Sequence, residues 1–278
     1  MIIIIMKCLI LGAKGMLGTE LSFVFRDYHP TLWDQADLDL TIESDVEKKI
    51  GKLKPQLIIN SAAYTNVDEA ESNQELAEKV NGEAVGYLAR VAQELNAVLI
   101  HYSTDYVFEG KKEKGYQEDD QTDPINAYGR SKLIGEKAIQ NYCKNYYLIR
   151  TSWLYGRSGN NFVETMIRLG KEKKEVKVVN DQFGKPTYAV DLARRTLNLV
   201  ENKKEYGIYH ITNEGVTSWS GFAEEIFKQF GLAVKVIPVA TSEFPRPAKR
   251  PKFSSLINTK LTPSRHWKEA LADYLAKR

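Results

Sequence analysis

The sequence has few of the features that mark secreted, membrane-spanning or nucleic-acid-binding proteins. It contains only two cysteines, Cys8 and Cys143, which leaves no room for a disulfide framework and is typical of a reducing compartment. Basic residues number 39 and acidic residues 36, so the formal net charge is only +3. Because no stretch forms a basic arm, we expect no nucleic-acid partner. The chain also lacks internal repeats and low-complexity tracts.

The apolar run at the start of the chain is too short for a membrane span. Residues 1–11 are mostly Ile, Met and Leu, but Lys7 interrupts them, and a span needs about 20 apolar residues. The run has no basic leader and no small-residue cleavage site, which argues against a signal peptide. We interpret it as a buried first strand, with Met6 as an alternative physiological start. A cytoplasmic protein without membrane contact is expected.

The first half of the chain alternates short apolar runs with amphipathic stretches, which is typical of a parallel sheet wrapped by helices. One such stretch, Glu75–Leu95, carries a predicted apolar stripe that includes Leu76 and Leu88. Right-handed crossovers between the strands would give an α/β fold with a doubly wound parallel (Rossmann) sheet. The predicted strands are Cys8–Leu11, Thr31–Trp33, Leu57–Asn60, Val98–Tyr102 and Tyr147–Arg150.

After about Arg150 short strands mix with helices, and prolines become frequent near the end. We therefore divide the chain into a dinucleotide-binding domain, residues 1–150, and a smaller α/β lobe, residues 151–278, which is interleaved with the first. Because ligands bind beyond the carboxyl ends of parallel strands, the cleft between the two is the expected site. The strands and helices predicted here are Val176–Val179, Ile208–Ile211, Val234–Val239, Asn161–Gly170 and Ser220–Phe230.

A glycine motif, Gly12-Ala-Lys-Gly15-Met-Leu-Gly18, directly follows the first predicted strand and opens a helix. Its first glycine permits a tight turn, its second lets the backbone approach a pyrophosphate, and its third lets the helix pack on the strand. The helix N-terminus adds free N–H groups and a partial positive charge, so Met16 and Leu17 would also line the site. The context predicts dinucleotide binding, and a glycine turn without a ligand is the alternative.

Charged residues near this motif give opposing signals about the coenzyme. Asp34 follows the second strand, where an acidic residue typically binds the adenosine ribose and favours NAD. Lys14 stands where it would meet a 2′-phosphate, which favours NADP. For both residues a solvated surface charge is the alternative. Just downstream, Asp39 and Leu40 would edge the adenine.

Tyr128 and Lys132 lie four residues apart, so on a helix both side chains project from one face. A phenol with a pKa of about 10 is a poor acid or base at neutral pH. A nearby ammonium favours the phenolate and lowers that pKa toward the working pH. The pair therefore predicts acid–base catalysis, although an exposed helix pair has the same spacing. Lys132 would in addition hold the nicotinamide ribose.

Hydroxyl and small side chains follow two other predicted strands. Ser103 and Thr104 come at the end of one strand, where a hydroxyl would share a carbonyl oxygen with Tyr128 and polarise it. The run Ala62-Ala63-Tyr64 ends the preceding strand, and its small side chains would let the nicotinamide half of a cofactor lie close to the backbone. Close packing of helix on strand is the alternative for those small residues.

Together these residues resemble the extended short-chain dehydrogenase/reductase superfamily and, within it, the dTDP-4-dehydrorhamnose reductases. The resemblance spans nearly the whole chain. Its most specific parts are Ser103-Thr-Asp-Tyr-Val-Phe108 and Arg150-Thr-Ser-Trp153. The other matching runs are Asn60–Glu71, Asn126–Glu136, Tyr155-Gly156, Asn161-Phe162, Asp181–Thr187 and Arg250-Pro251.

The resemblance implies a reductase that transfers a hydride to the C4 ketone of dTDP-4-dehydro-L-rhamnose and forms dTDP-L-rhamnose. On this basis Tyr128 donates the proton, Lys132 lowers its pKa, and Thr104 hydrogen-bonds the carbonyl oxygen. NADPH is favoured as cofactor, NADH is the alternative, and Ser103 is expected close to it. Trp153 would stack on the sugar ring, with a core aromatic as the alternative. The implied substrate contacts are Thr104, Asp105, Tyr106, Trp153, Asn161 and Arg250.

One departure from the family concerns a metal. Some members dimerise through a Mg²⁺ held by glutamates near the start of the helix after a Pro-Thr pair. Here Val190 stands at the matching position, so we predict no metal, and a homodimer is considered without one. Asp191 is expected to cap a helix that starts at Leu192.

Two other functions stay open at this point. The first is a nucleotide-sugar epimerase or dehydratase of the same superfamily, which would keep its cofactor tightly bound. The second is a non-catalytic regulatory binding protein of the same fold. The Tyr128 and Lys132 pair does not discriminate between the reductase and an epimerase or dehydratase, whereas the Thr104-Asp105-Tyr106 run and Trp153 favour the reductase. An intact Thr104, Tyr128 and Lys132 argues weakly against the regulatory protein, because such proteins can retain the pair.

Overall fold

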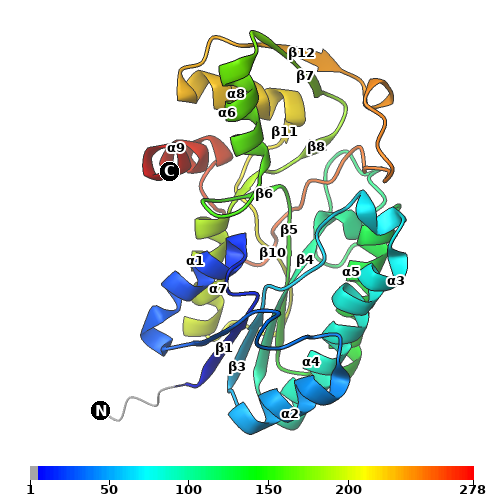
Figure 1. The fold of residues 1–278 in the computed structure, drawn as a ribbon, viewed down its shortest axis with the longest axis vertical. Helices are drawn as coiled ribbons and strands as arrows, with labels where there is room; N and C mark the ends of the chain where they lie inside the picture. Colours follow the sequence, from blue (N-terminus) through cyan, green and yellow to red (C-terminus); the bar gives the residue numbers. More distant parts are fainter. Residues whose placement is uncertain (1–5) are drawn as a thin grey trace.

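The computed structural model describes residues 6–278, so the predicted use of residues 1–5 in the first strand lies outside the described part. Within it, six parallel strands form a sheet in the order β10-β5-β4-β3-β1-β2 (Figure 1). The strand bounds are β1 Cys8–Leu11, β2 Thr31–Trp33, β3 Leu57–Asn60, β4 Val98–Thr104, β5 Tyr146–Thr151 and β10 Gly207–His210. The α/β prediction with a doubly wound parallel sheet is therefore confirmed.

The order of the strands reverses between β1 and β3. From β1 the chain goes outward to β2, and the later strands β3, β4, β5 and β10 follow one another on the opposite side. In open parallel sheets a crevice opens beyond the carboxyl ends of the strands at such a switch point. The end of β1 at Leu11 and the end of β3 at Asn60 are paired in register, so both contribute to this crevice.

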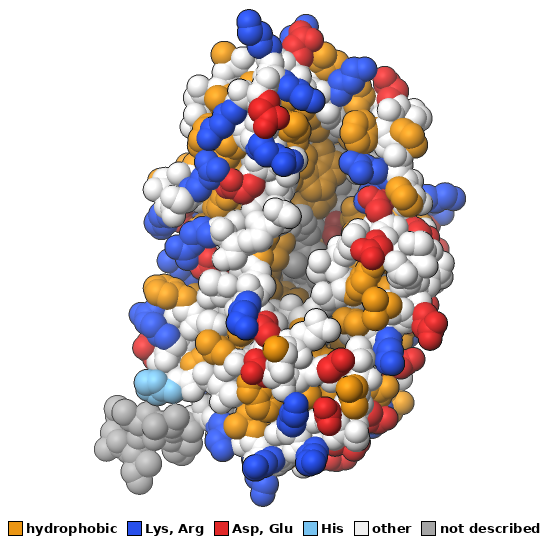
Figure 2. All heavy atoms as spheres, viewed as in Figure 1, with side chains coloured by type: hydrophobic (Ala, Val, Ile, Leu, Met, Phe, Trp, Pro, Cys, Tyr) orange, Lys and Arg blue, Asp and Glu red, His pale blue; other side chains and the backbone are white. Residues whose placement is uncertain are grey.

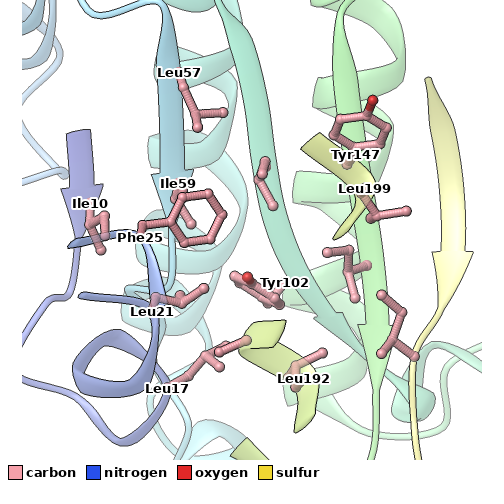
Figure 3. Packing of buried hydrophobic residues seen from close by; sticks show 14 of the residues in the cluster. Ile10, Leu17, Leu21, Phe25, Leu57, Ile59, Tyr102, Tyr147, Leu192 and Leu199 are labelled. Atoms are coloured by element: carbon pink, nitrogen blue, oxygen red, sulfur yellow. The ribbon is translucent and has the colours of Figure 1, made fainter. Parts of the chain in front are cut away.

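Helices α1 (Met16–Val24) and α7 (Ala189–Glu201) cover one face of the sheet. Figure 3 shows their side chains, among them Leu21 and Leu192, meeting alternate strand residues such as Ile10 and Ile59. Full burial of a Leu or Ile side chain contributes about 1.5–3 kcal/mol. The strands read as continuous apolar runs because both of their faces are covered.

The opposite face is covered by α2 (Glu43–Leu53), α4 (Ala84–Glu94) and α5 (Ala127–Tyr142), which pack on the other set of alternate strand residues. The predicted stretch Glu75–Leu95 is helical, but a π-helical turn, Lys79–Glu83, separates α3 (Gln74–Glu78) from α4. Leu88 is buried as predicted, whereas Leu76 is 47% exposed, so its place in the core stripe was wrong. Leu76 precedes the π-helical turn and lies instead at a cavity described below.

The part of the chain above the sheet in Figure 1 has an aromatic-rich core of its own. It includes Tyr155, Tyr188, Phe222 and Trp267. Two predicted helices occur here with shifted ends, as α6 (Phe162–Glu172) and α8 (Trp219–Phe230). The remaining elements are β6 Leu154–Tyr155, β7 Glu175–Val179, β8 Phe183–Gly184, β9 Thr187–Tyr188, β11 Thr217–Ser218, β12 Lys235–Val239 and α9 Trp267–Lys277. Short 3-10 helices lie at Arg26–Tyr28, Glu69–Glu71, Asp105–Val107 and Thr241–Glu243.

Helix α7 begins earlier than the sequence suggested. Its first residue is Ala189, and Tyr188 precedes it as the N-cap, so the prediction that Asp191 caps this helix was wrong. Asp191 lies in the first turn, where its carboxylate pairs with Arg265 at 2.7 Å and accepts a hydrogen bond from Asn213 at 2.7 Å. These partners come from distant segments, so local spacing carried no sign of them.

Three features of residues 6–278 concern membranes, metals and disulfides. No helix in this range is both long and apolar enough to cross a membrane. The same residues hold no group of three or more His, Cys, Asp and Glu side chains arranged for a metal ion. Cys8 and Cys143 are both buried as free thiols.

Candidate active site

The loop after β1 touches the end of β3 at the point where the strand order reverses. Gly12 has a φ of +72°, and a Cβ placed on it would lie 2.7 Å from the backbone nitrogen of Ala62. A Cβ on Gly18 would lie only 2.0 Å from the carbonyl oxygen of Gly12. The tight turn and the close helix packing predicted for these two glycines are therefore present, and larger side chains would push both elements apart.

The N-terminus of α1 is left open toward the same crevice. Gly15 is the N-cap residue, and within the described chain no side chain caps this end and no acidic residue lies in its first turn. The N–H groups of that turn, from Met16 and Leu17 onward, thus remain available to an anion. Met16 extends its side chain toward Gly156, while Leu17 is buried in the core. This arrangement fits a bound diphosphate.

A cavity of about 330 Å³ lies beside this helix end. Its size suits one half of a dinucleotide, since small-molecule sites span about 300–1,000 Å³. The residues that line it come from the ends of β1, β2 and β3, from the segment after β2, and from α3 and the π-helical turn that follows it. They include seven of the cofactor contacts predicted from the sequence. They are Leu11, Gly12, Trp33, Asp34, Gln35, Leu38, Asp39, Leu40, Thr41, Ala62, Ala63, Tyr64, Leu76 and Val80.

The two residues with opposing coenzyme preferences lie against each other. The backbone nitrogen of Lys14 donates to the Asp34 carboxylate at 3.2 Å, and its Nζ lies 3.6 Å from the same carboxylate. The Lys14 side chain is 82% exposed, so this pair adds little to stability and can separate at small cost. Asp39 holds Thr41 by two hydrogen bonds, which lower the pKa of its carboxyl.

Tyr128 lies at the start of α5, close to the end of β4. Asn126 caps this helix by accepting the N–H of Gly129 at 2.7 Å, and its own amide donates to the Lys249 carbonyl at 2.8 Å. Burial raises the pKa of Tyr128 to about 12, the Asp105 carboxylate adds to this rise, and a hydrogen bond with Thr104 opposes it. The phenol is therefore protonated at neutral pH, as a proton donor must be.

Lys132 does not act on Tyr128 as the sequence-based argument expected. Its Nζ donates to the Tyr102 carbonyl oxygen at 2.6 Å and lies 3.1 Å from Nε2 of His101. Burial lowers the pKa of Lys132 to about 8. The prediction that this lysine lowers the pKa of Tyr128 is wrong for the protein without cofactor, because burial outweighs any such effect and the lysine is turned toward β4.

Polar groups at the end of β4 are held by one another, and some stay unpaired. Thr104 Oγ1 lies 3.0 Å from the Asp105 carboxylate and accepts the N–H of Tyr106 at 3.1 Å. Burial raises the pKa of Asp105 to about 7. Ser103 Oγ and Asp105 Oδ2 are buried without a hydrogen-bond partner in residues 6–278. Such groups cost free energy unless a ligand or water satisfies them, which fits a binding site here.

Trp153 follows β5 in a left-handed backbone conformation, with φ +46°. Its ring stacks on Trp219 with centroids 3.6 Å apart and planes 7° from parallel. Trp219 is anchored in turn by a hydrogen bond from its Nε1 to Gln182 at 3.2 Å, and Phe162 packs beside it. Both indole rings are only partly buried. Figure 2 shows that the face of the molecule viewed in Figure 1 is hollowed between its upper and lower parts, with apolar side chains on the upper wall.

Two of the remaining predicted substrate contacts, Asn161 and Arg250, form bonds within the protein. Asn161 caps α6 by accepting the N–H of Glu164 at 3.0 Å and donates to the Gly156 carbonyl at 2.9 Å. Arg250 forms an ion pair with Asp68 and donates to the Ala248 carbonyl at 2.7 Å. Their contact with substrate stays a prediction. Tyr106 lies edge-on to Tyr128, with ring centroids 6.0 Å apart.

The sequence-based reasoning missed three residues at this site: Trp219, His101 and Asn60. His101 stands two residues before Ser103 in a run that was recognised, and Asn60 ends the preceding strand, yet neither received a role. The available signal was the polarity of these two residues, because a histidine and an asparagine inside otherwise apolar strands must find buried partners. Trp219 gave no comparable signal, because its partner Trp153 is distant along the chain.

Known proteins resemble the chain along its full described length. The family model described as RmlD substrate binding domain matches residues 6–278. The spore coat polysaccharide biosynthesis protein SpsK of Bacillus subtilis is 39% identical over 278 residues, which cover 98% of each chain. The dTDP-4-dehydrorhamnose reductase of Burkholderia thailandensis is 41% identical over 275 residues, which cover 92% of each chain.

Solved structures give the same result. The crystal structure of a dTDP-4-dehydrorhamnose reductase from Clostridium acetobutylicum matches with a TM-score of 0.95 and 45% identity, over 98% of this chain and 99% of that one. The reductase of the same name from Bacillus anthracis, crystallised in complex with NADP, has a TM-score of 0.95 and 40% identity with the same coverage.

Proposed function

The chain belongs to the RmlD substrate binding domain family, and from this membership we propose that it is an NADPH-dependent reductase. Its substrate is dTDP-4-dehydro-L-rhamnose, and reduction of the C4 ketone yields dTDP-L-rhamnose. Two relatives with this reductase name are 41% and 45% identical to the chain, over 92% and 98% of its length. A neighbour of the same name binds NADP.

One observation in the chain itself carries the proposal. A protonated phenol, Tyr128, lies beside the Thr104 hydroxyl at the carboxyl end of β4, one turn before Lys132. The glycine loop at Gly12 and the open end of α1 lie on the same edge of the sheet, because all of its strands are parallel. A ketone bound between them would therefore meet an acid and a hydride donor together.

Bound NADPH supplies the hydride that C4 receives. Tyr128 gives its phenolic proton to the C4 oxygen, so the ketone becomes an alcohol and the phenolate regains a proton from solvent. Thr104 donates a hydrogen bond to the same oxygen and holds the carbonyl in place. Lys132 binds the nicotinamide ribose, and Asp105 accepts a hydrogen bond from the substrate through its unpaired oxygen.

The remaining cofactor contacts follow the cavity and the helix end. Met16 and Leu17 offer backbone N–H groups to the diphosphate, Asp34 and Lys14 meet the adenosine ribose and its 2′-phosphate, and Ala62 gives the nicotinamide half close access to the backbone. Trp153, supported by Trp219, presents an aromatic face to the sugar. In this proposal residues 1–150 bind the cofactor and supply Tyr128 and Lys132. Residues 151–278 bind the substrate and also contain α7 and β10, which complete the sheet layers of the first part.

Two further parts of the proposal concern assembly and location. We propose action in the cytoplasm, supported by two cysteines that are buried as free thiols. A homodimer that needs no metal is the proposed assembly, since Val190 stands where some relatives carry a metal-binding glutamate. Light scattering of the purified protein, with and without a chelator, measures both its mass and its independence of metal.

The activity test compares two tyrosines of the same helix. Purified protein is mixed with dTDP-4-dehydro-L-rhamnose and NADPH or NADH, and the loss of reduced nicotinamide is followed by absorbance. Tyr128→Phe should lower turnover about 10²–10⁴-fold, the usual contribution of a general acid, with little change in cofactor affinity. Tyr142→Phe, on the exposed end of α5, should leave turnover unchanged.

Two outcomes would contradict the proposal. Normal turnover by Tyr128→Phe would mean that the proton comes from elsewhere. Nucleotide released from purified protein only on denaturation, together with conversion of a nucleotide sugar without net oxidation of NADPH, would indicate an epimerase or dehydratase instead.

A further inference from the structure

Behind Lys132 two buried polar side chains continue a line of contacts across the sheet. Lys132 Nζ of α5 lies 3.1 Å from Nε2 of His101 in β4, and Nδ1 of the same ring lies 3.1 Å from Nδ2 of Asn60 in β3. Each of the three residues is only 1% exposed. Because no bulk water reaches them, the donors and acceptors along this line must match one another.

The backbone determines which way the Asn60 amide points. Its Oδ1 accepts the N–H of Ala62 at 3.1 Å, and a backbone N–H can only donate. Rotating the amide by half a turn would set two donors against each other at that contact. The Asn60 Nδ2 group therefore faces His101 as a donor, and Nδ1 of the imidazole must accept.

This assignment decides the proton position on the ring. Burial lowers the pKa of His101 well below its usual range, so the imidazole is neutral and carries a single N–H. With Nδ1 accepting, that proton is on Nε2 and points at Lys132. An ammonium group has no lone pair to receive it, whereas a neutral amine has one. A neutral Lys132 also keeps its hydrogen bond to the Tyr102 carbonyl at 2.6 Å.

We propose that His101 is a positioning residue that holds Lys132 as a neutral amine at weakly alkaline pH while no cofactor is bound, so that the ammonium form arises when an anionic cofactor enters. The part that concerns the cofactor rests on the proposed function. The proton arrangement itself rests only on the contacts of Asn60, His101 and Lys132.

Other titratable groups also lie near the lysine. Glu136, one turn further along α5, favours the ammonium, but its carboxylate is bound by Arg150 through bonds of 3.0 and 2.7 Å. Tyr128 is neutral, and the negative charge of Asp105 raises the pKa of Tyr128. Burial lowers the pKa of Lys132 to about 8, in the same direction as the hydrogen-bond pattern.

The direct test is the tautomer of His101, read from ¹⁵N chemical shifts of the imidazole nitrogens in protein without cofactor at weakly alkaline pH. His210 provides an opposite standard in the same spectrum. Its Nδ1 lies 3.0 Å from the Ile257 carbonyl oxygen, which can only accept, so His210 carries its proton on Nδ1. We expect His101 to carry its proton on Nε2. A proton on Nδ1 of His101 would overturn the inference.

The nearly isosteric variant Asn60→Asp tests whether the amide of Asn60 determines which nitrogen of His101 carries the proton. In Asn60→Asp a carboxylate accepts at both contacts, so the imidazole proton should move to Nδ1 and Nε2 should accept from an ammonium. Selective ¹³C labelling of the lysine Cε atoms measures the titration midpoint of Lys132. We expect a midpoint at or below about 8 in the natural protein, against about 10.4 for exposed lysines. The midpoint should be higher in the Asn60→Asp variant. An unchanged tautomer or midpoint in a folded variant would contradict the inference, and the tautomer of the natural protein decides if the variant does not fold.

These measurements need no substrate. A protein with the expected tautomer that fails to reduce any sugar nucleotide would therefore disprove the proposed function and leave this inference standing. An active reductase in which His101 carries its proton on Nδ1 would disprove this inference and leave the proposed function standing.

Discussion

Binding of NADPH should be accompanied by uptake of a proton at Lys132. Burial lowers the pKa of this lysine to about 8 in the protein without cofactor, so at pH 8 the side chain holds about half a proton on average. The negative charge of the cofactor favours the ammonium and raises that pKa toward its ordinary value of about 10.4. The expected uptake is therefore about half a proton at pH 8 and almost none at pH 6, where the lysine is already charged.

Isothermal titration calorimetry measures this number directly. NADPH is titrated into the protein at one pH in several buffers that differ in ionisation enthalpy, and the slope of the observed heat against that enthalpy equals the protons taken up. Lys132→Met should abolish the slope that develops between pH 6 and pH 8, while Lys137→Met, an exposed lysine on the same helix, should keep it. Asp105→Asn removes the other buried group that titrates near this range. A slope of zero at pH 8 would refute the reasoning.

Three substitutions test other parts of the structure. Lys14→Ala should weaken NADPH binding about tenfold or more, the cost of losing a charged hydrogen bond, and NADH binding much less; an equal loss for both would make Lys14 an ordinary surface charge. Trp219→Leu removes an aromatic stack of about 0.5–1.5 kcal/mol and frees Trp153, so KM for the sugar nucleotide should rise more than kcat falls in steady-state assays. Arg150→Met leaves Glu136 buried and unpaired, which should lower the free energy of unfolding in urea by about 3–5 kcal/mol; a change below about 1 kcal/mol would show that the ion pair is dispensable.

The parallel sheet was predictable because its strands are covered on both faces. Residues at Cys8–Leu11 and Leu57–Asn60 are buried throughout, so they read as short continuous apolar runs, and the structure has both strands with the predicted bounds. The glycine motif was equally predictable, because Gly12 takes a positive φ in the turn and Gly18 packs against the carbonyl of Gly12 only six residues away. The Tyr128 and Lys132 pair follows from helical spacing alone.

Side-chain partners were much less predictable. Helical spacing puts Lys132 on the same face as Tyr128, yet a long flexible side chain takes whichever acceptor the packing brings within reach. The packing of α5 on β4 supplies the Tyr102 carbonyl and the His101 ring, and so the lysine turns there. The same limit applies to Asp191, whose partner Arg265 is far along the chain.

Patterns with a short period reveal strands, helices and the turn that binds phosphate, because these depend on backbone geometry and on neighbours a few residues away. The stacking of Trp153 on Trp219, the exposure of Leu76 and the proton position on His101 depend on segments that meet only after the chain has folded. A long-range contact leaves no periodic trace in the sequence. Its chemistry can be worked out only once the distances between the groups are known.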